Sequence, residues 1–174
     1  MKNLLTDRLK NYLLILLSIA VIISGPMLYE EKVKNNREYG RFLNQFYHEL
    51  DITLSQIDFL LSSYEGDENF DLGYNLSLLD KRLERTHLTL ESGNNYVDSE
   101  IRTQTYFFMN RIKIPRANDD GELGKNVKEE LESIKEGLEY MKVGLSSEGT
   151  EQENKNITVK EFNEILKEGA AIGD

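Results

Sequence analysis

The sequence predicts an all-α protein with a single N-terminal transmembrane helix, a four-helix antiparallel bundle and a short C-terminal amphipathic helix. Two observations lead to this prediction. Residues 12–29 form an apolar run without a charge, and several later stretches place large apolar side chains at steps of three and four residues. The chain also lacks cysteine, so its fold cannot depend on disulfides.

The apolar run, YLLILLSIAVIISGPMLY, lies between Lys10 and Glu30. At a rise of about 1.5 Å per residue, a helix over residues 12–29 extends roughly 27 Å, close to the ~30 Å hydrocarbon core of a bilayer. We interpret it as an uncleaved signal-anchor helix. A cleaved signal peptide is the alternative, because basic residues precede the run, but apolar residues continue beyond the small residues 24–26.

The orientation of this helix depends on the basic residues that flank it. The numbers of basic residues on the two sides are nearly equal. We therefore infer the orientation from the high density of basic residues in residues 1–11 and from the acidic residues Glu30 and Glu31 on the other side. We expect residues 1–11 to form a cytoplasmic tail. The bulk of this single-pass protein is then extracytoplasmic, at the cell membrane of a bacterium.

The charge balance limits the possible partners. The 174-residue chain has 31 acidic and 21 basic residues, which gives a net charge of −10. Residues 1–29 hold three bases and one acid, whereas residues 30–174 hold eighteen bases and thirty acids, so the remainder of the chain is strongly acidic. Because such a surface repels phosphate groups, we expect no nucleic-acid partner.

Residues 30–38 are almost entirely polar and predict a juxtamembrane stalk, and residues 39–145 predict the helical bundle domain. The first helix of the domain has a broad, aromatic apolar face. This breadth argues for burial among several helices rather than for the narrow seam of a two-stranded coiled coil. The predicted face consists of Tyr39, Leu43, Phe46, Leu50, Leu54, Ile57, Leu61 and Tyr64.

Three further amphipathic helices complete the predicted domain. The second is expected to have Asp71 as its N-cap and to end at the turn-forming residues 92–95. The third begins near Asp98 and ends before Pro115, although its β-branched and aromatic residues leave a strand as the alternative. The fourth covers residues 123–145 and has an outer face of acidic and basic side chains.

The C-terminal part of the chain combines a polar stretch with a short helix. Residues 146–157 have the composition of a flexible linker, and residues 158–174 contain a helix that starts with a capping box of Thr158 and Glu161. Such a short helix is unstable alone in water, so it must dock on another surface. We expect reversible docking on the bundle and exchange onto a partner protein, with permanent packing as the alternative. The partner-binding face consists of Val159, Phe162, Ile165 and Leu166.

The search for chemistry finds no catalytic, nucleotide or metal motif above chance, so we expect neither enzyme activity nor a cofactor. Glu84 and His87 have the carboxylate–histidine spacing of di-iron bundles, but the second histidine, His48, has Gln45 at the matching position. We therefore interpret His87 as a histidine at a helix seam and His48 as a surface residue.

Two functional hypotheses follow. The first is a membrane-anchored helical interaction module that binds or regulates another membrane or envelope protein. The second is an extracytoplasmic sensor of a small ligand that signals through a membrane partner. A filled bundle would favour the first hypothesis, and a ligand-sized interior cavity the second. The candidate pocket of the sensor consists of Phe42, Phe46, Tyr47, Phe107 and Phe108.

Overall fold

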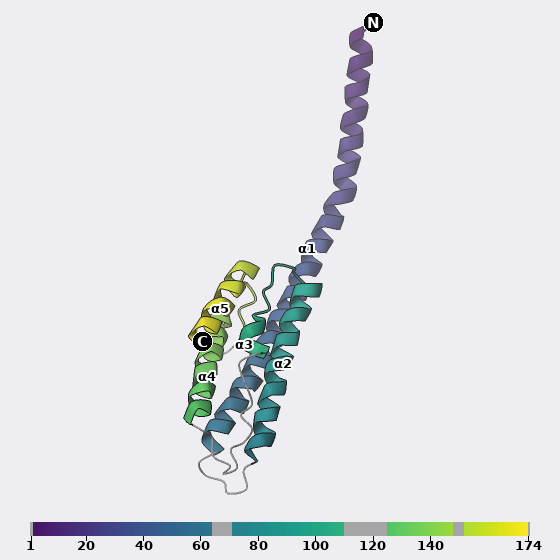
Figure 1. Ribbon diagram of the computed structural model, residues 1–174. Coiled ribbons are helices and arrows are strands. Elements are labelled where there is room, and N and C mark those ends of the chain that lie inside the picture. The colour runs from purple at the N-terminus through teal and green to yellow at the C-terminus, as the bar shows by residue number, and fades with distance from the viewer. Residues whose placement is uncertain (1, 64–70, 110–124, 148–151, 174) are drawn as a thin grey trace. The chain divides into compact units, whose positions relative to one another are not determined.

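The structure is a computed structural model that describes residues 2–63, 71–109, 125–147 and 152–173 (Figure 1). Its elements are helices, and the described ranges contain no strand beyond an isolated bridge between Ser146 and Glu153. The prediction of an all-α protein is therefore confirmed. The helices are α1 (Lys2–Ser63), α2 (Leu72–Tyr96), α3 (Thr105–Met109), α4 (Lys125–Leu145) and α5 (Val159–Ile172).

The chain divides into two compact units, Met1–Glu38 and Tyr39–Asp174. In the described part of the chain, no helix has both the length and the apolar character needed to cross a bilayer. Part of the predicted signal-anchor segment lies outside the described side chains, including those of Ile15, Ile19 and Ile23. The described apolar side chains of residues 12–29 are exposed, among them Tyr12 and Ile22.

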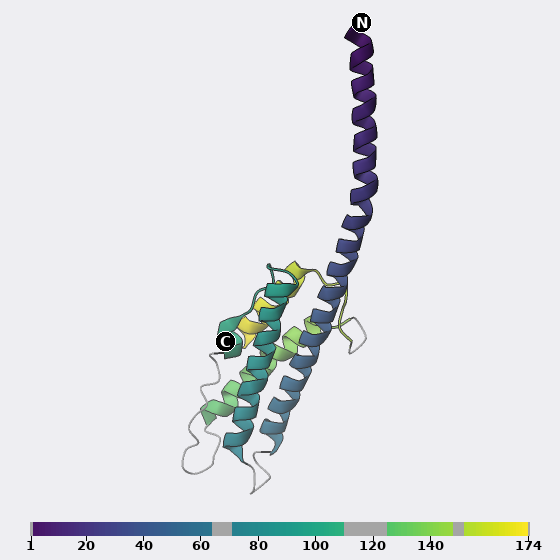
Figure 2. The same ribbon diagram turned by 90° about the vertical axis from the view of Figure 1, so that its right-hand side faces the viewer.

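The second unit is a helical bundle, which confirms that prediction. Part of α1 lies beside α2, α4 and α5, and these helices surround one apolar core (Figures 1 and 2). The apolar spacing of three and four residues places the large side chains of each helix on its inner face. The largest fully buried side chains are Phe46, Leu50, Ile57, Leu60, Leu76, Leu79, Leu83, Leu90, Ile101, Leu131, Ile134 and Phe162.

Helix α2 begins as predicted but ends later. The Asp71 side chain accepts a hydrogen bond from the backbone N–H of Tyr74 at 2.9 Å, so Asp71 is the N-cap. The helix continues through the predicted turn to Tyr96. Gly93 serves packing there instead of chain reversal, because a Cβ atom at this position would lie 2.4 Å from the Phe42 ring.

The predicted start of the third helix, near Asp98, is wrong. Residues 97–104 are not helical, and α3 begins only at Thr105. Local side-chain hydrogen bonds replace helical ones: Asp98 accepts from the N–H of Glu100 at 2.8 Å, and the Asn94 amide donates to the carbonyl of Ile101 at 2.8 Å. Short polar side chains of this kind compete with helix formation. The predicted end of the helix, before residue 115, lies outside the described residues.

Residues 146–157, predicted as a linker, are described at 146–147 and 152–157, where they fold back on themselves. The N–H of Ser147 donates to the carbonyl of Gln152 at 2.8 Å, and the N–H of Asn154 donates to that of Leu145 at 2.8 Å. Ile157, the last residue of this stretch, is buried in the core. The connection to α5 is thus held at both ends.

Helix α5 starts at the predicted capping box and packs closely on α4. Glu161 donates its N–H to Thr158 Oγ1 at 3.3 Å and accepts the N–H of Thr158 at 2.8 Å. Further along, α4 and α5 meet at two glycines. A Cβ atom at Gly137 would lie 2.5 Å from the carbonyl oxygen of Gly169, so these backbones approach too closely for any larger residue.

Candidate functional site

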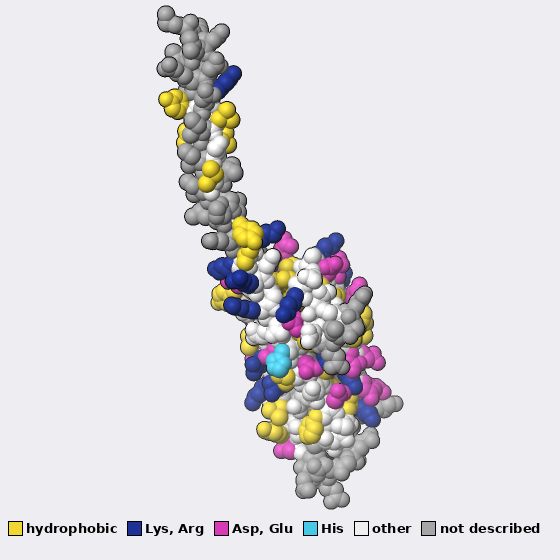
Figure 3. Space-filling model, turned by 180° about the vertical axis from the view of Figure 1, so that it is seen from behind, with side chains coloured by type: hydrophobic (Ala, Val, Ile, Leu, Met, Phe, Trp, Pro, Cys, Tyr) yellow, Lys and Arg dark blue, Asp and Glu magenta, His cyan; other side chains and the backbone are white. Residues whose placement is uncertain are grey.

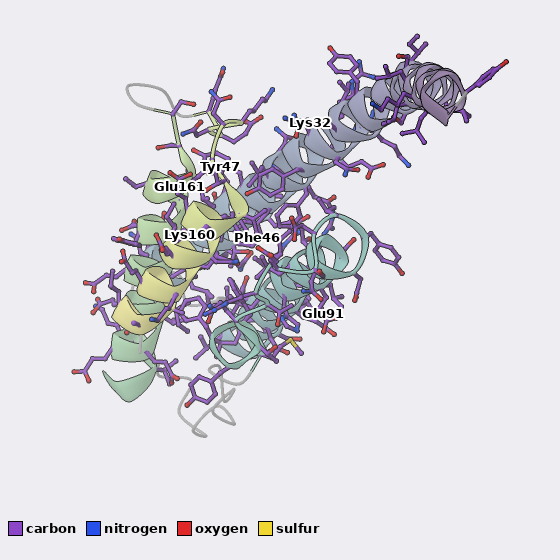
Figure 4. All side chains as sticks on the ribbon, turned by 90° about the horizontal axis from the view of Figure 1, so that it is seen from above. Lys32, Phe46, Tyr47, Glu91, Lys160 and Glu161 are labelled. Atoms are coloured by element: carbon purple, nitrogen blue, oxygen red, sulfur yellow. The ribbon has the colours of Figure 1, made fainter. Side chains whose placement is uncertain are left out.

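The predicted pocket residues separate into a buried group and one surface residue. Phe42, Phe46, Phe107 and Phe108 are buried, and their rings contact one another. The centroid of the Phe46 ring lies 6.4 Å from that of Phe108, in an edge-on arrangement. These side chains therefore occupy the middle of the bundle themselves. Tyr47 instead lies toward α4, whereas Phe46 points into the bundle (Figure 4).

The predicted partner-binding face of α5 belongs to the same core. Phe162 and Leu166 are fully buried, and the Phe162 ring lies 5.3 Å from that of Phe42 between centroids. Val159 and Ile165 are partly buried against the core. In this docked arrangement α5 presents charged side chains outward, Lys160 and Glu161 among them (Figure 4).

A buried polar layer between α1 and α2 was not foreseen from the sequence. Glu49 is 1% exposed, and one of its oxygens lies 2.8 Å from Arg85 Nε. Thr53 Oγ1 donates to the Glu49 carbonyl at 2.7 Å and lies 3.2 Å from Thr86 Oγ1. The second carboxylate oxygen, Glu49 Oε2, is buried without a hydrogen-bond partner among the described residues. A usable signal was present, because Glu49 follows Phe46 by three residues and so shares its face.

The histidines lie where the sequence suggested. His87 is buried at the seam of α2 and the segment before α3, with Nδ1 3.3 Å from the carbonyl oxygen of Thr103 and Nε2 3.4 Å from a Glu91 oxygen. His48 is exposed. Within the described ranges, no group of three or more His, Asp and Glu side chains has a geometry that could hold a metal ion.

A groove of about 470 Å³ separates α1 from α4 on the surface of the second unit; we call it the α1/α4 groove. Its walls include Tyr47, Asp51, Leu54 and Asp58 from α1, and Glu139, Lys142 and Val143 from α4.

Two ion pairs join the walls of the α1/α4 groove. Lys142 pairs with Asp51, and Lys135 Nζ lies 2.6 Å from Asp58 Oδ1. The hydrogen bond to Asp58 is the main reason that the pKa of Lys135 is raised above its ordinary value. Since residue numbers rise along α1 as they fall along α4, the two helices are antiparallel here. In Figure 3, acidic and basic side chains are interspersed over the face of the bundle that is seen from behind.

A second hollow, of about 540 Å³, lies between α5 and the segment before α3. Asn163 joins these two parts: its Oδ1 accepts the N–H of Arg102 at 2.9 Å, and its Nδ2 donates to the carbonyl of Glu100 at 2.8 Å. Three cationic side chains, of Arg102, Lys160 and Lys167, line the hollow together with the carboxylates of Glu100 and Glu164.

The comparisons with known proteins add no family assignment. No protein-family model, curated protein or solved structure matches this chain.

Proposed function

We propose that this protein is a membrane-anchored helical interaction module that binds or regulates another membrane or envelope protein. The observation that carries the proposal is the filled core. The aromatic side chains that could have lined a ligand pocket contact one another, and the two hollows described above among the residues that the structure describes lie on the surface. A domain of this kind is suited to present surfaces to another protein.

The membrane part of the proposal is supported by the sequence of residues 12–29, which contains no charged residue. It forms a single signal-anchor helix, with residues 1–11 as a cytoplasmic tail and the four-helix antiparallel bundle outside the membrane. Protease added to spheroplasts should then digest the chain after residue 29 and spare the tail. Protection of residues 39–174 would reverse the proposed orientation.

The partner part of the proposal follows from the charged helical surfaces of the second unit. Residues 30–174 have more acidic than basic side chains, and a charged surface of this kind is suited to contact with another protein. The apolar face of α5 is one proposed contact surface, and it becomes available only when α5 leaves the bundle.

Crosslinking in native membranes, followed by purification of the full chain, tests the interaction. We expect one membrane or envelope protein to be recovered with the full chain and not with a matched control that carries residues 1–29 alone. Equal recovery by both chains would attribute the contact to the anchor. If crosslinkers of several lengths recover no protein with the full chain, the proposal is wrong.

The second candidate function, a small-ligand sensor, is favoured by the α1/α4 groove alone. Its volume of about 470 Å³ is in the range of ligand sites, and Tyr47 from the predicted pocket lines it. Native mass spectrometry of the protein released gently from membranes would reveal a small molecule that co-purifies with it. A mass equal to that of the bare chain would argue against the sensor.

A further inference from the structure

We propose that the α1/α4 groove binds a basic amphipathic helix of the partner, one that carries Lys or Arg at two positions seven residues apart with apolar residues between them. This inference rests on the proposed function, because it names the class of surface that the partner presents. It concerns a different face from the apolar side of α5.

The floor of the groove supplies apolar contact. Val143 of α4 is 72% exposed, and Leu54 and the partly buried ring of Tyr47 lie on the α1 side of the same groove. From Tyr47 to Asp58 the α1 wall extends roughly 16 Å, which is the length of three helical turns. A helix lying along the groove can therefore place one row of apolar side chains on this floor.

The rim of the groove supplies charge at a helical spacing. Asp51 and Asp58 are seven residues apart on α1, or two turns, and their side chains are 51% and 56% exposed. Each contacts its lysine through Oδ1. Because a carboxylate can accept more than one hydrogen bond, both aspartates can receive a second cation from a partner.

The sign of the charge selects a cationic occupant. Asp51 and Asp58 on α1 and Glu139 on α4 place three carboxylates around the groove beside two lysines of α4, on a chain whose net charge is −10. An approaching basic helix is attracted by this field, whereas an acidic segment is repelled. A second copy of the chain is disfavoured as the occupant, since it would bring identical acidic rims together.

The geometry favours a helix over an extended segment. Residues i and i+7 of a helix lie on one face and about 10.5 Å apart, as do Asp51 and Asp58. An extended segment would cover that distance in about three residues, and its side chains would alternate between the floor and the solvent. A helix keeps its apolar row on Val143 and both cations on the α1 rim.

A synthetic peptide pair tests the inference with the full chain in micelles of a neutral detergent. The first peptide is a capped, fluorescently labelled helix with Lys at i and i+7 and Leu at i+3 and i+4; the second has Glu in place of both Lys. Fluorescence anisotropy, corrected for binding to empty micelles, should show tighter binding of the lysine peptide by at least tenfold. We expect Val143→Lys to weaken its binding at least tenfold and Asp58→Asn several-fold.

Leu88→Lys is the matched control, because Leu88 is an exposed apolar residue of α2, away from the groove. It makes the same change in charge and should leave binding unchanged. Circular dichroism checks that the three variants remain helical. Equal weakening by Val143→Lys and Leu88→Lys would mean attraction to an acidic chain in general, and would overturn the inference, as would equal binding of the two peptides.

Two other results would also overturn it. A dimer in analytical ultracentrifugation that Val143→Lys dissolves would assign the groove to a second copy. Recovery of the native partner by the Val143→Lys chain at the wild-type level would move the partner to another surface, while the proposed function would stand. If the full chain recovers no partner at all, the proposed function fails, whatever the peptides do.

Discussion

In the Glu49–Arg85 ion pair, we expect substitution of one residue to change the free energy of unfolding differently from substitution of the other. Glu49 is 1% exposed, whereas the Arg85 side chain is 63% exposed, so only the carboxylate has lost its water. Replacing Arg85 with alanine leaves this buried charge uncompensated, since Glu49 Oε2 has no hydrogen-bond partner in the part of the chain that the structure describes. Breaking a buried pair in this way costs about 3–5 kcal/mol, and we expect the lower end because Arg85 is open to solvent.

The opposite substitution should behave differently. Glu49→Met removes the charge, keeps a side chain of similar length and leaves Arg85 free to be hydrated. Replacing a buried ionic group with an apolar one is often neutral, or stabilising by about 1–4 kcal/mol. The double variant Glu49→Met with Arg85→Ala should therefore resemble Glu49→Met, because the arginine then has no buried charge to compensate.

Urea unfolding of residues 39–174, the second compact unit, measures these free energies by circular dichroism. Lys81→Ala is the control, because Lys81 is an exposed cation of α2 and its loss should change stability by less than about 0.5 kcal/mol. The reasoning is refuted if Arg85→Ala costs no more than this control. It is refuted also if Glu49→Met destabilises as strongly as Arg85→Ala, since the carboxylate itself would then be needed.

Three further predictions concern α5. Gly137→Ala should destabilise the unit by about 1–3 kcal/mol, because its Cβ would collide with the backbone of α5, whereas Gly40→Ala, with open space at its Cβ, should be neutral or slightly stabilising. Hydrogen bonds from Thr158 lower the pKa of Glu161 below its ordinary value of 4.5, so their stabilisation is present above about pH 4.5 and is lost as the pH falls through the lowered pKa. Thr158→Ala should weaken this acid dependence and cost about 1 kcal/mol in urea titrations. If docking of α5 is reversible, amides of residues 162–167 should exchange hydrogen much faster than those of residues 131–138, and equal protection would show permanent packing.

The sequence predicts this fold best where local signals are strong and repeated. The apolar spacing along α1, α2 and α4 identifies the buried faces, and Asp71 and Thr158 begin their helices as expected, because capping depends only on residues a few positions away. The same reasoning fails where tertiary contacts decide. Gly93 looks like a helix stop, but the Phe42 ring packs against it and the helix continues.

The third predicted helix shows how a local pattern can mislead. Ile101 is buried, as its apolar spacing suggests, yet its backbone is not helical. Asn94 and Asn163 take the backbone groups of residues 99–102, and Asn163 is about sixty positions away in the chain. The spacing of apolar residues indicates which side chains are buried. It does not indicate that a side-chain amide far away in the sequence will replace the helical hydrogen bonds.

The α1/α4 groove could not be predicted because it exists only when two helices meet in one register. Lys135 and Lys142, seven residues apart, face Asp58 and Asp51, also seven apart, in antiparallel order. Moving α4 by four residues would place Glu139 opposite Asp58, where two carboxylates repel each other. Each exposed ion pair contributes less than about 1 kcal/mol to stability. The shifted register, however, loses both ion pairs and adds a repulsion between carboxylates. Together the two pairs therefore favour the observed register of α1 and α4. The positions that fix the register are thus those that form the rim of the groove, so the contacts that align α4 with α1 also create the proposed binding surface.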